Sequence, residues 1–152
     1  MAIIEKDELY NLVPHKDKMF LLSRIIEYNE SALTSEFDIS DDCIFYDDAI
    51  TGLPSWISFE LMAQSVSALV GIGRRNLGKP PKPGFILSVS SMEFYLPVLK
   101  CGETARTLIV EDCRVDAVST FACKTTINGK KVAEAKLTCV EVDDSGLVAK
   151  VF

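Results

Sequence analysis

The sequence has a single histidine, a single tryptophan and no apolar run near the ~20 residues that a membrane-spanning helix needs. Its first seven residues include acidic side chains where a secretory signal has a basic segment followed by an apolar one. There are five cysteines, an odd number, and no two of them form a Cys-x-x-Cys pair. This pattern disfavours both a disulfide framework and a zinc site. These absences predict a cytoplasmic protein with reduced thiols and no membrane span.

The sequence also lacks a glycine-rich phosphate loop and a cluster of metal ligands, so it implies no cofactor and no metal. A net charge of −6 disfavours nucleic acid as a partner, because phosphate binding needs a cationic surface. Four aspartates within residues 40–53 lack the spacing of a calcium loop. What remains is a chain of 152 residues, 48% of them hydrophobic, which suits a single domain over residues 1–152.

One stretch, residues 52–73, is the only long helix-like segment, and it is apolar nearly all round. Pro54 or Ser55 can begin the helix, because proline is tolerated in a first turn and serine can cap it. The helix is predicted to end after two arginines in its last turn. Gly78 follows as a left-handed cap, and prolines lie beyond it. The pattern predicts a core helix of roughly twenty residues.

In most of the remaining chain, hydrophobic and polar residues alternate as they do in β-strands. A short helix over residues 5–13 and a hairpin of two strands, residues 20–28 and 32–39, precede the long helix. Four strands are expected after it, at residues 85–95, 104–115, 118–127 and 131–142, with the hairpin signal Asn128-Gly129 between the last two. A sheet and one apolar helix can both be buried if the sheet curls around the helix, so we predict an α+β hotdog fold.

The few polar residues of the long helix share one stripe, because Glu60, Gln64 and Ser67 follow at i, i+4 and i+7. An unpaired buried carboxyl is costly, so Glu60 needs an explanation. It is either a structural acid paired with Gln64 or a backbone donor, or a functional acid. We favour the functional interpretation.

Two motifs in order carry a family resemblance. Residues 12–24 (LVPHKDKMFLLSR), followed by Pro54 and then residues 60–64 (ELMAQ), resemble the hotdog-fold 3-hydroxyacyl-carrier-protein dehydratases of fatty-acid synthesis over almost the whole chain. The Gly-Leu-Pro-Ser-Trp entry to the helix is more similar to a divergent branch found in aryl-polyene biosynthesis clusters. The resemblance implies a protein that acts on acyl thioesters carried by the phosphopantetheine of an acyl carrier protein.

The resemblance also implies roles for individual residues. Glu60 would be the acid that protonates the departing hydroxyl, and Gln64 would orient it. Backbone N–H groups in the region of Pro54, Ser55 and Trp56 would stabilise the thioester oxygen, since the positive end of the helix favours a developing anion.

The sequence departs from the family where the catalytic histidine is expected. Family members carry it in a Gly-His-Phe-Pro stretch before the helix, whereas residues 45–50 of this chain are FYDDAI. His15 matches a Pro-His motif that is not the catalytic one, and it is either a structural residue or a substitute base. Tyr46 and Asp48 are the other candidate bases. Tyr46 and Trp56 are either packing residues or walls of a substrate site.

Three functions follow from these residues. The chain is a dehydratase by itself, or a partner subunit in a homodimer or heterodimer, since family sites take the histidine from one chain and the acid from the other. The third is a hotdog thioesterase, in which Glu60 activates water or attacks the thioester. Acyl carriers are acidic, so the basic segment could dock one or could simply complement the helix C-terminus; its residues are Arg74, Arg75, Lys79 and Lys82.

Overall fold

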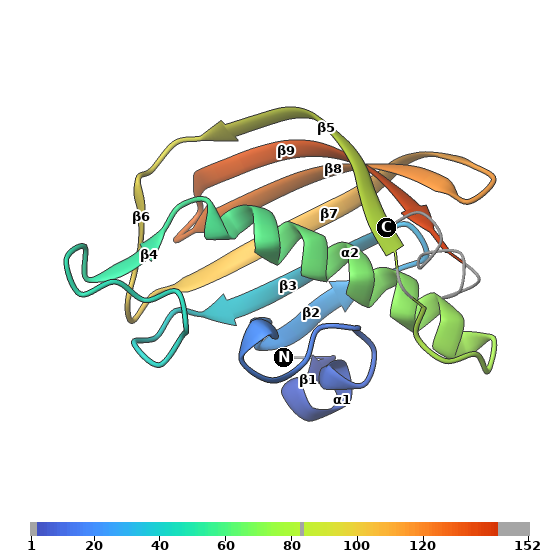
Figure 1. Ribbon diagram of the computed structural model, residues 1–152, viewed down its shortest axis with the longest axis horizontal. Helices are drawn as coiled ribbons and strands as arrows, with labels where there is room; N and C mark the ends of the chain where they lie inside the picture. Colours follow the sequence, from blue (N-terminus) through green and yellow to red (C-terminus); the bar gives the residue numbers. More distant parts are fainter. Residues whose placement is uncertain (1–2, 83, 143–152) are drawn as a thin grey trace, which may run out of the picture.

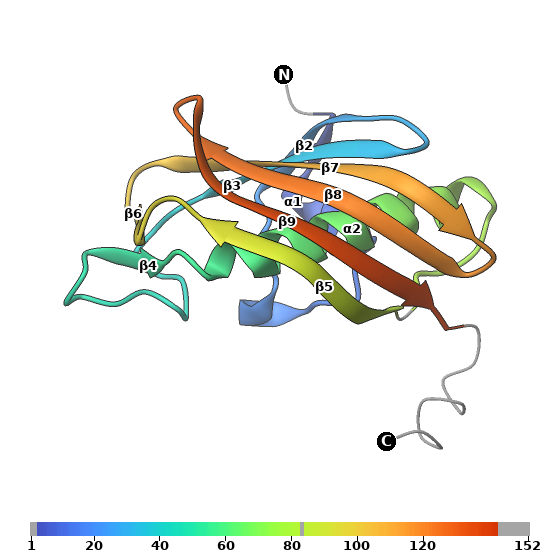
Figure 2. The same ribbon diagram turned by 90° about the horizontal axis from the view of Figure 1, so that it is seen from above.

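The computed structural model describes residues 3–82 and 84–142, in which an antiparallel sheet curves around one long helix, α2 (Ile57–Asn76) (Figures 1 and 2). The seven strands of this sheet run in the order β1 (Ile4–Glu5), β2 (Arg24–Tyr28), β3 (Ala32–Asp38), β7 (Thr104–Val115), β8 (Val118–Ile127), β9 (Lys130–Glu141) and β5 (Gly84–Phe94). This arrangement confirms the predicted α+β hotdog fold.

Four shorter elements complete the fold around the long helix and the large sheet. A two-stranded sheet of β4 (Gly52–Pro54) and β6 (Val98–Lys100) leads directly into α2, and the Ser55 N–H donates to the Pro97 carbonyl at 3.1 Å. The N-terminal α1 (Lys6–Tyr10) and a 3-10 turn, η1 (Asp17–Met19), lie beside the sheet before β2 (Figure 1).

The buried side of α2 and the concave face of the sheet share one hydrophobic core. Its fully buried members include Ile57, Leu61 and Met62 of α2, together with Ile109 and Leu137 of the sheet. Burial of each such side chain contributes about 1.5–3 kcal/mol, which explains why a helix apolar nearly all round is stable here.

Elements that are predicted from short stretches of neighbouring residues lie where the sequence predicts them. The strands β7 and β8 have the predicted bounds, and Asn128 and Gly129 take φ values of 52° and 77° at the hairpin between β8 and β9. Gly78, at φ 69°, follows α2 as the predicted left-handed residue.

Two boundary predictions are wrong. The helix predicted over residues 5–13 covers Lys6–Tyr10, and the strand predicted from residue 20 begins at Arg24. Between them, the backbone groups of Met19 and Leu21 bond to the side chain of Gln64, so they are not available to a neighbouring strand. The predicted serine cap is also wrong, since the N-cap of α2 is Trp56 and no side chain caps it.

Gly71 of α2 packs directly against the chain at Leu12. A Cβ at position 71 would lie 2.0 Å from the carbonyl oxygen of Leu12, which is backbone and cannot rotate away. We expect Gly71→Ala to lower the free energy of unfolding by about 1–3 kcal/mol in urea titrations, because overpacking outweighs the better helix propensity of alanine.

Gly73 provides the matched control, two residues along the same helix. A Cβ there meets nothing within 4 Å. Gly73→Ala should therefore raise the free energy of unfolding by roughly 0.5–1 kcal/mol. Equal effects of the two substitutions would show that Gly71 is not in close contact with Leu12.

Candidate active site

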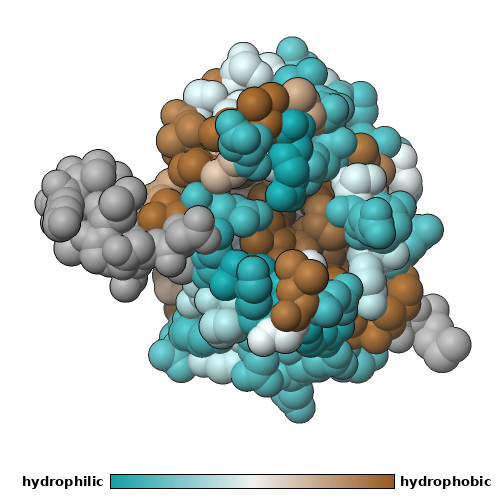
Figure 3. All heavy atoms as spheres, turned by 90° about the vertical axis from the view of Figure 1, so that its right-hand side faces the viewer, coloured by the Kyte–Doolittle hydropathy of each residue, from teal (hydrophilic) through white to brown (hydrophobic). Residues whose placement is uncertain are grey.

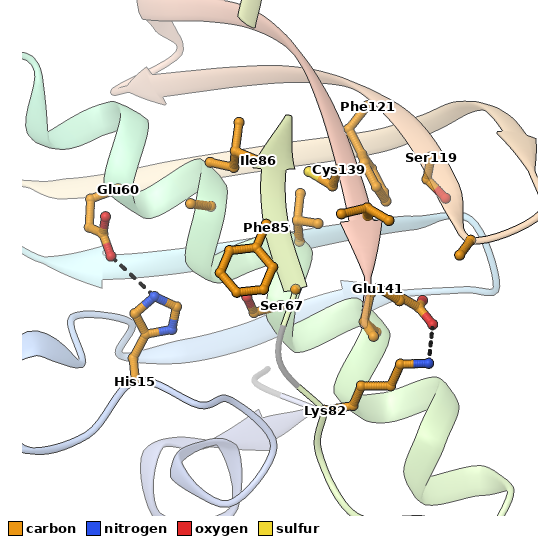
Figure 4. A pocket seen from close by; sticks show the side chains of 16 residues that line it. His15, Glu60, Ser67, Lys82, Phe85, Ile86, Ser119, Phe121, Cys139 and Glu141 are labelled. Carbon is orange, nitrogen blue, oxygen red and sulfur yellow. Dashed lines mark ion pairs between the residues drawn. The ribbon is translucent and has the colours of Figure 1, made fainter. Parts of the chain in front are cut away.

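An acid and the only histidine of the sequence meet beside α2. His15 lies in the loop between α1 and η1, Glu60 lies in the first turn of α2, and the His15 Nε2 is 3.3 Å from the Glu60 Oε1 (Figure 4). The two side chains are 24% and 27% exposed. They are therefore shielded from most of the solvent yet still accessible from a cavity.

Gln64 joins Glu60 to the segment after His15 through three hydrogen bonds. The side chain is fully buried, and its Nε2 donates to Glu60 Oε1 at 2.9 Å and to the Met19 carbonyl at 2.7 Å. Its Oε1 accepts the Leu21 N–H at 2.9 Å. The contact through which Gln64 can orient Glu60 is thus present, and the same side chain ties the segment after His15 to the helix.

The surroundings of His15 indicate which of its nitrogens carries hydrogen. Its Nδ1 is buried and has no hydrogen-bond partner among the described residues. Buried N–H groups without an acceptor are rarer than unpaired acceptors, so we assign the hydrogen to Nε2, the nitrogen that lies 3.3 Å from the Glu60 Oε1. Burial lowers the pKa of His15, although the carboxylate of Glu60 opposes this effect. A neutral His15 in contact with the Glu60 carboxyl follows.

The lowered pKa predicts how His15 makes stability depend on pH. Between its folded and unfolded pKa values the unfolded chain binds more protons, so the free energy of unfolding rises with pH there. We expect this contribution to be complete above a pH of about 6.5 and to be lost as the pH falls through that value towards the lower folded pKa. Urea titrations across this range should show it.

His15→Gln is the comparison for this prediction, because glutamine does not titrate. In the variant, the free energy of unfolding should no longer rise with pH in the range just below the ordinary histidine pKa. An unchanged slope in the variant would assign the pH dependence to other groups.

A cavity of about 220 Å³ begins at His15 and Glu60 and follows α2. Its helix wall is one stripe of side chains: Glu60, Ala63, Val66, Ser67 and Val70. The opposite wall comes from β5, β8, β9 and the loop before β8, and consists of Gly84, Phe85, Ile86, Ala117, Ser119, Phe121, Cys139 and Val140 (Figure 4). The cavity is therefore mainly apolar between two polar ends.

Lys82 and Glu141 form the other end of this cavity, with the Lys82 Nζ 3.5 Å from the Glu141 Oε2 (Figure 4). A second cleft adjoins this end of the cavity. The two share Lys82, Glu141, Val70 and Phe121, and the second cleft continues along Arg74. Viewed from the right-hand side of Figure 1, where the C-terminal end of α2 emerges, the surface has a hollow with apolar side chains inside and hydrophilic ones around it (Figure 3).

Of the three candidate bases, only His15 lies beside Glu60 among the described residues. His15 contacts the carboxyl group directly, whereas Tyr46 and Asp48 do not line the cavity. Both of these lie in the segment that precedes β4.

The residues predicted to bind substrate at the helix entry also lie outside the cavity lining. Tyr46, Pro54, Ser55 and Trp56 all precede α2, and Trp56 is 55% exposed. Pro54 has no N–H, and the Ser55 N–H already donates to the carbonyl of Pro97. Their role in binding the thioester stays a prediction.

The four basic residues predicted to dock a carrier do not act as one set. Arg75 pairs with Glu8, while Arg74 and Lys79 lie at the end of α2 and just beyond it. Lys82 has a side chain that is 10% exposed and faces the cavity instead. Docking by Arg74, Arg75, Lys79 and Lys82 stays a prediction.

Sequence reasoning missed most of the cavity wall. Phe121 and Cys139 fall on the inward face of β8 and β9 by simple alternation, but alternation does not show which inward residues border a gap. Glu141 lies at the last position of β9, where no motif indicates a site.

Within residues 3–82 and 84–142, no helix is long and apolar enough to cross a membrane. The same residues contain no group of three or more histidine, cysteine, aspartate or glutamate side chains placed to hold a metal ion.

A curved sheet around one apolar helix, with a helix carboxyl at the inner end of an apolar cavity, defines a hotdog-fold protein with an acid in its pocket. Residues 8–150 match the family model described as ApeP-like, ApeP dehydratase. The chain belongs to this family of dehydratases, which confirms the resemblance found in the sequence.

Individual relatives agree with this assignment. The 3-hydroxyacyl-(acyl-carrier-protein) dehydratase FabZ of Rickettsia akari is 27% identical over 148 residues, which covers 94% of this chain and 99% of the relative. FabZ of Actinobacillus succinogenes is 25% identical over 158 residues, with coverages of 90% and 92%.

Solved structures resemble the fold as a whole. A chain of the dehydratase heterocomplex ApeI:P from Xenorhabdus doucetiae superposes with a TM-score of 0.86 at 18% identity, covering 94% of this chain and 96% of that one. A hypothetical thioesterase with coenzyme A from Streptococcus pneumoniae superposes with a TM-score of 0.59 at 16% identity, with coverages of 78% and 84%. At these identities the likeness establishes the fold.

Proposed function

We propose that this chain is the acid-bearing subunit of a 3-hydroxyacyl-(acyl-carrier-protein) dehydratase and that a second hotdog subunit completes its active site. One observation carries the proposal: Glu60 stands at the inner end of the cavity with Gln64 and His15 both directed at one of its oxygens.

Glu60 suits the acid step of dehydration. The reaction needs a base to take a proton from C2, an acid to protonate the hydroxyl that leaves C3, and donors for the thioester oxygen. Because Oε1 of Glu60 accepts from Gln64 and faces His15, a proton resides more readily on Oε2. From there it can pass to the departing hydroxyl, which leaves as water.

His15 does not suit the base step. Its Nδ1 is buried and its Nε2 is already in contact with the Glu60 Oε1 at 3.3 Å, so neither nitrogen is placed to take the C2 proton. In this proposal His15 is a positioning residue that keeps the Glu60 carboxyl aligned. The sequence has no other histidine, and Tyr46 and Asp48 do not line the cavity, so in this proposal the partner supplies the base.

The edge strand β5 supports a partner of the same fold. It lies at the end of the sheet, and its exposed apolar side chains include Leu87 at 58%, Val89 at 42% and Phe94 at 43%. An unpaired apolar edge is a template for another strand. The first residues of β5, including Phe85 and Ile86, also wall the cavity, so a subunit paired here would border the site. The chain of similar fold from Xenorhabdus doucetiae belongs to a dehydratase heterocomplex, which supports a partner subunit for this chain as well.

The test follows enoyl formation from a 3-hydroxyacyl thioester carried on an acyl carrier protein. This chain alone, a histidine-bearing hotdog homologue alone and an equimolar mixture are compared, with the complex verified by size-exclusion chromatography. We expect efficient enoyl formation from the mixture and little from this chain alone.

Each other outcome identifies a different function. Equal turnover by this chain alone would remove the need for a partner and return His15, Tyr46 or Asp48 to consideration as the base. Free acid in place of enoyl product would identify a thioesterase, as the fold permits. Thioester binding without turnover in any mixture would identify a non-catalytic acyl-binding subunit.

A further inference from the structure

The loop that carries His15 is closed onto itself by the next residue, Lys16. The Lys16 Nζ donates to the carbonyls of Tyr10 and Val13, the latter at 2.9 Å, and lies 4.2 Å from the centre of the Tyr10 ring. A cation thus serves carbonyls at and after the end of α1 and also contacts an aromatic face. The Tyr10 hydroxyl in turn accepts the Asp17 N–H at 3.3 Å. We call these contacts the Lys16–Tyr10 clamp.

The clamped loop has a conformation that needs support from its surroundings. Asp17 has a φ of 54°, in the left-handed region that residues other than glycine seldom adopt. The Nδ1 of His15, two residues earlier, is buried without a hydrogen-bond partner in the described part of the chain. Such unfavourable features persist only where other contacts hold them, and they are concentrated at functional sites. The clamp supplies such contacts, because it fixes residues on both sides of His15.

The clamp directs His15 towards the acid. The His15 Nε2 lies 3.3 Å from the Glu60 Oε1, and Figure 4 shows the imidazole reaching from the loop to the helix. Gln64 anchors the segment that follows the clamp to α2. The approach of His15 to Glu60 is therefore defined twice, by the clamp within the loop and by Gln64 on the helix.

The charge of Lys16 acts on the same site. Burial lowers the pKa of His15, the carboxylate of Glu60 opposes this effect, and the ammonium of Lys16 lowers the pKa further. Glu60 and Lys16 are the charged groups that act on His15 among the described residues. A neutral imidazole suits the acid step, since an imidazolium beside Glu60 would favour the ionised carboxylate, which has no proton to deliver.

We propose that Lys16, clamped on Tyr10, is a positioning residue for dehydration, which holds a neutral His15 against Glu60 so that this carboxyl can deliver its proton. The inference rests on the proposed function, because it takes Glu60 as the general acid. It adds a residue that lies outside the cavity lining and acts only through His15.

The first test follows His15 by NMR. Because the sequence has one histidine, isotopic labelling of this chain alone gives histidine signals from His15 only, both in the free chain and in the assembled complex. We expect the wild-type nitrogen shifts at neutral pH to show a neutral imidazole with its hydrogen on Nε2 and a pKa below about 6.5. A cationic imidazole at neutral pH, or a hydrogen on Nδ1, would overturn the proposal.

Two substitutions assign this state to Lys16. Lys16→Met removes the positive charge and the donor, so the pKa of His15 should rise. Lys16→Arg keeps a cation at this position and should keep the pKa low. An equal pKa of His15 in the wild type and in Lys16→Met would contradict the role of Lys16.

The same variants are then compared in the enoyl assay. Lys16→Met should lower kcat of the assembled complex by roughly tenfold to a hundredfold with little change in KM, because the acid is misaligned while the substrate contacts are retained. The deficit should grow as the pH falls through the histidine range, where His15 of the variant becomes cationic. Lys16→Arg should restore most of the lost kcat. Unchanged kcat in Lys16→Met would overturn the proposal even if the pKa of His15 rises.

Lys18→Met is the control for these measurements. Lys18 is exposed, lies two residues along the chain from Lys16, and donates to neither of the carbonyls that Lys16 contacts. This variant should leave the pKa of His15 and kcat unchanged. A change equal to that in Lys16→Met would attribute the effect to overall charge and refute the clamp.

The two readouts separate this proposal from the dehydratase proposal. Absence of enoyl formation by the wild-type complex would refute the proposed function, whatever NMR shows. Normal wild-type turnover with no effect of Lys16→Met would refute the positioning role alone. The wild-type NMR measurement requires no variant, so it tests the proposal even if Lys16→Met prevents folding.

Discussion

Replacement of Glu60 by glutamine is expected to lower enoyl formation by the assembled complex by a factor of about 10²–10⁴, the usual contribution of a general acid. Glutamine has nearly the same shape, and its amide oxygen can still accept the N–H of Gln64, so the local structure is maintained. It has no acidic proton for the departing hydroxyl. The loss should appear in kcat, measured at saturating carrier-bound substrate.

Glu27→Gln is the control for this experiment. Glu27 is an exposed residue of β2 and does not line the cavity, so the same chemical change there should leave turnover unaltered. The free energy of unfolding should be similar in both variants. Near-normal turnover of Glu60→Gln would show that the acid lies elsewhere.

Gln64→Leu is expected to have the largest effect on stability at the site, lowering the free energy of unfolding by about 2–5 kcal/mol. Leucine fills the space but leaves the Leu21 N–H and the Met19 carbonyl without a partner, and an unsatisfied buried group costs about 1–3 kcal/mol. The substitution also removes the donor that aligns Glu60. Urea titration and the enoyl assay should both report a loss.

Thr125→Val provides the comparison for Gln64→Leu. The Thr125 hydroxyl is fully buried and bonds to one side chain, that of Thr107 at 2.9 Å, outside the cavity. Valine has a similar shape but leaves one buried group, the Thr107 hydroxyl, without this partner, so the substitution should cost about 1–3 kcal/mol and leave enoyl formation unchanged. Losses of equal size in the two variants would indicate that Gln64 has no special role in joining the loop to the helix.

Much of the fold is predictable from short-range patterns. Alternation with a period of two places β7 and β8, and Asn128-Gly129 places the hairpin, because these signals involve only neighbouring residues. The strand predicted from residue 20 failed for a tertiary reason. Its strand-forming side chains are present, but the Leu21 N–H bonds to the side chain of Gln64, on another element, instead of to a neighbouring strand.

The sequence by itself determined the α+β hotdog fold and the acid with its glutamine, because Glu60 and Gln64 are one helical turn apart on a helix too apolar to lie at the surface. Only the tertiary structure decided that His15 contacts this acid and that Lys82 and Glu141 meet at the far end of the cavity. These partners are remote in sequence, and their contacts depend on how the N-terminal loop and the sheet pack around the helix.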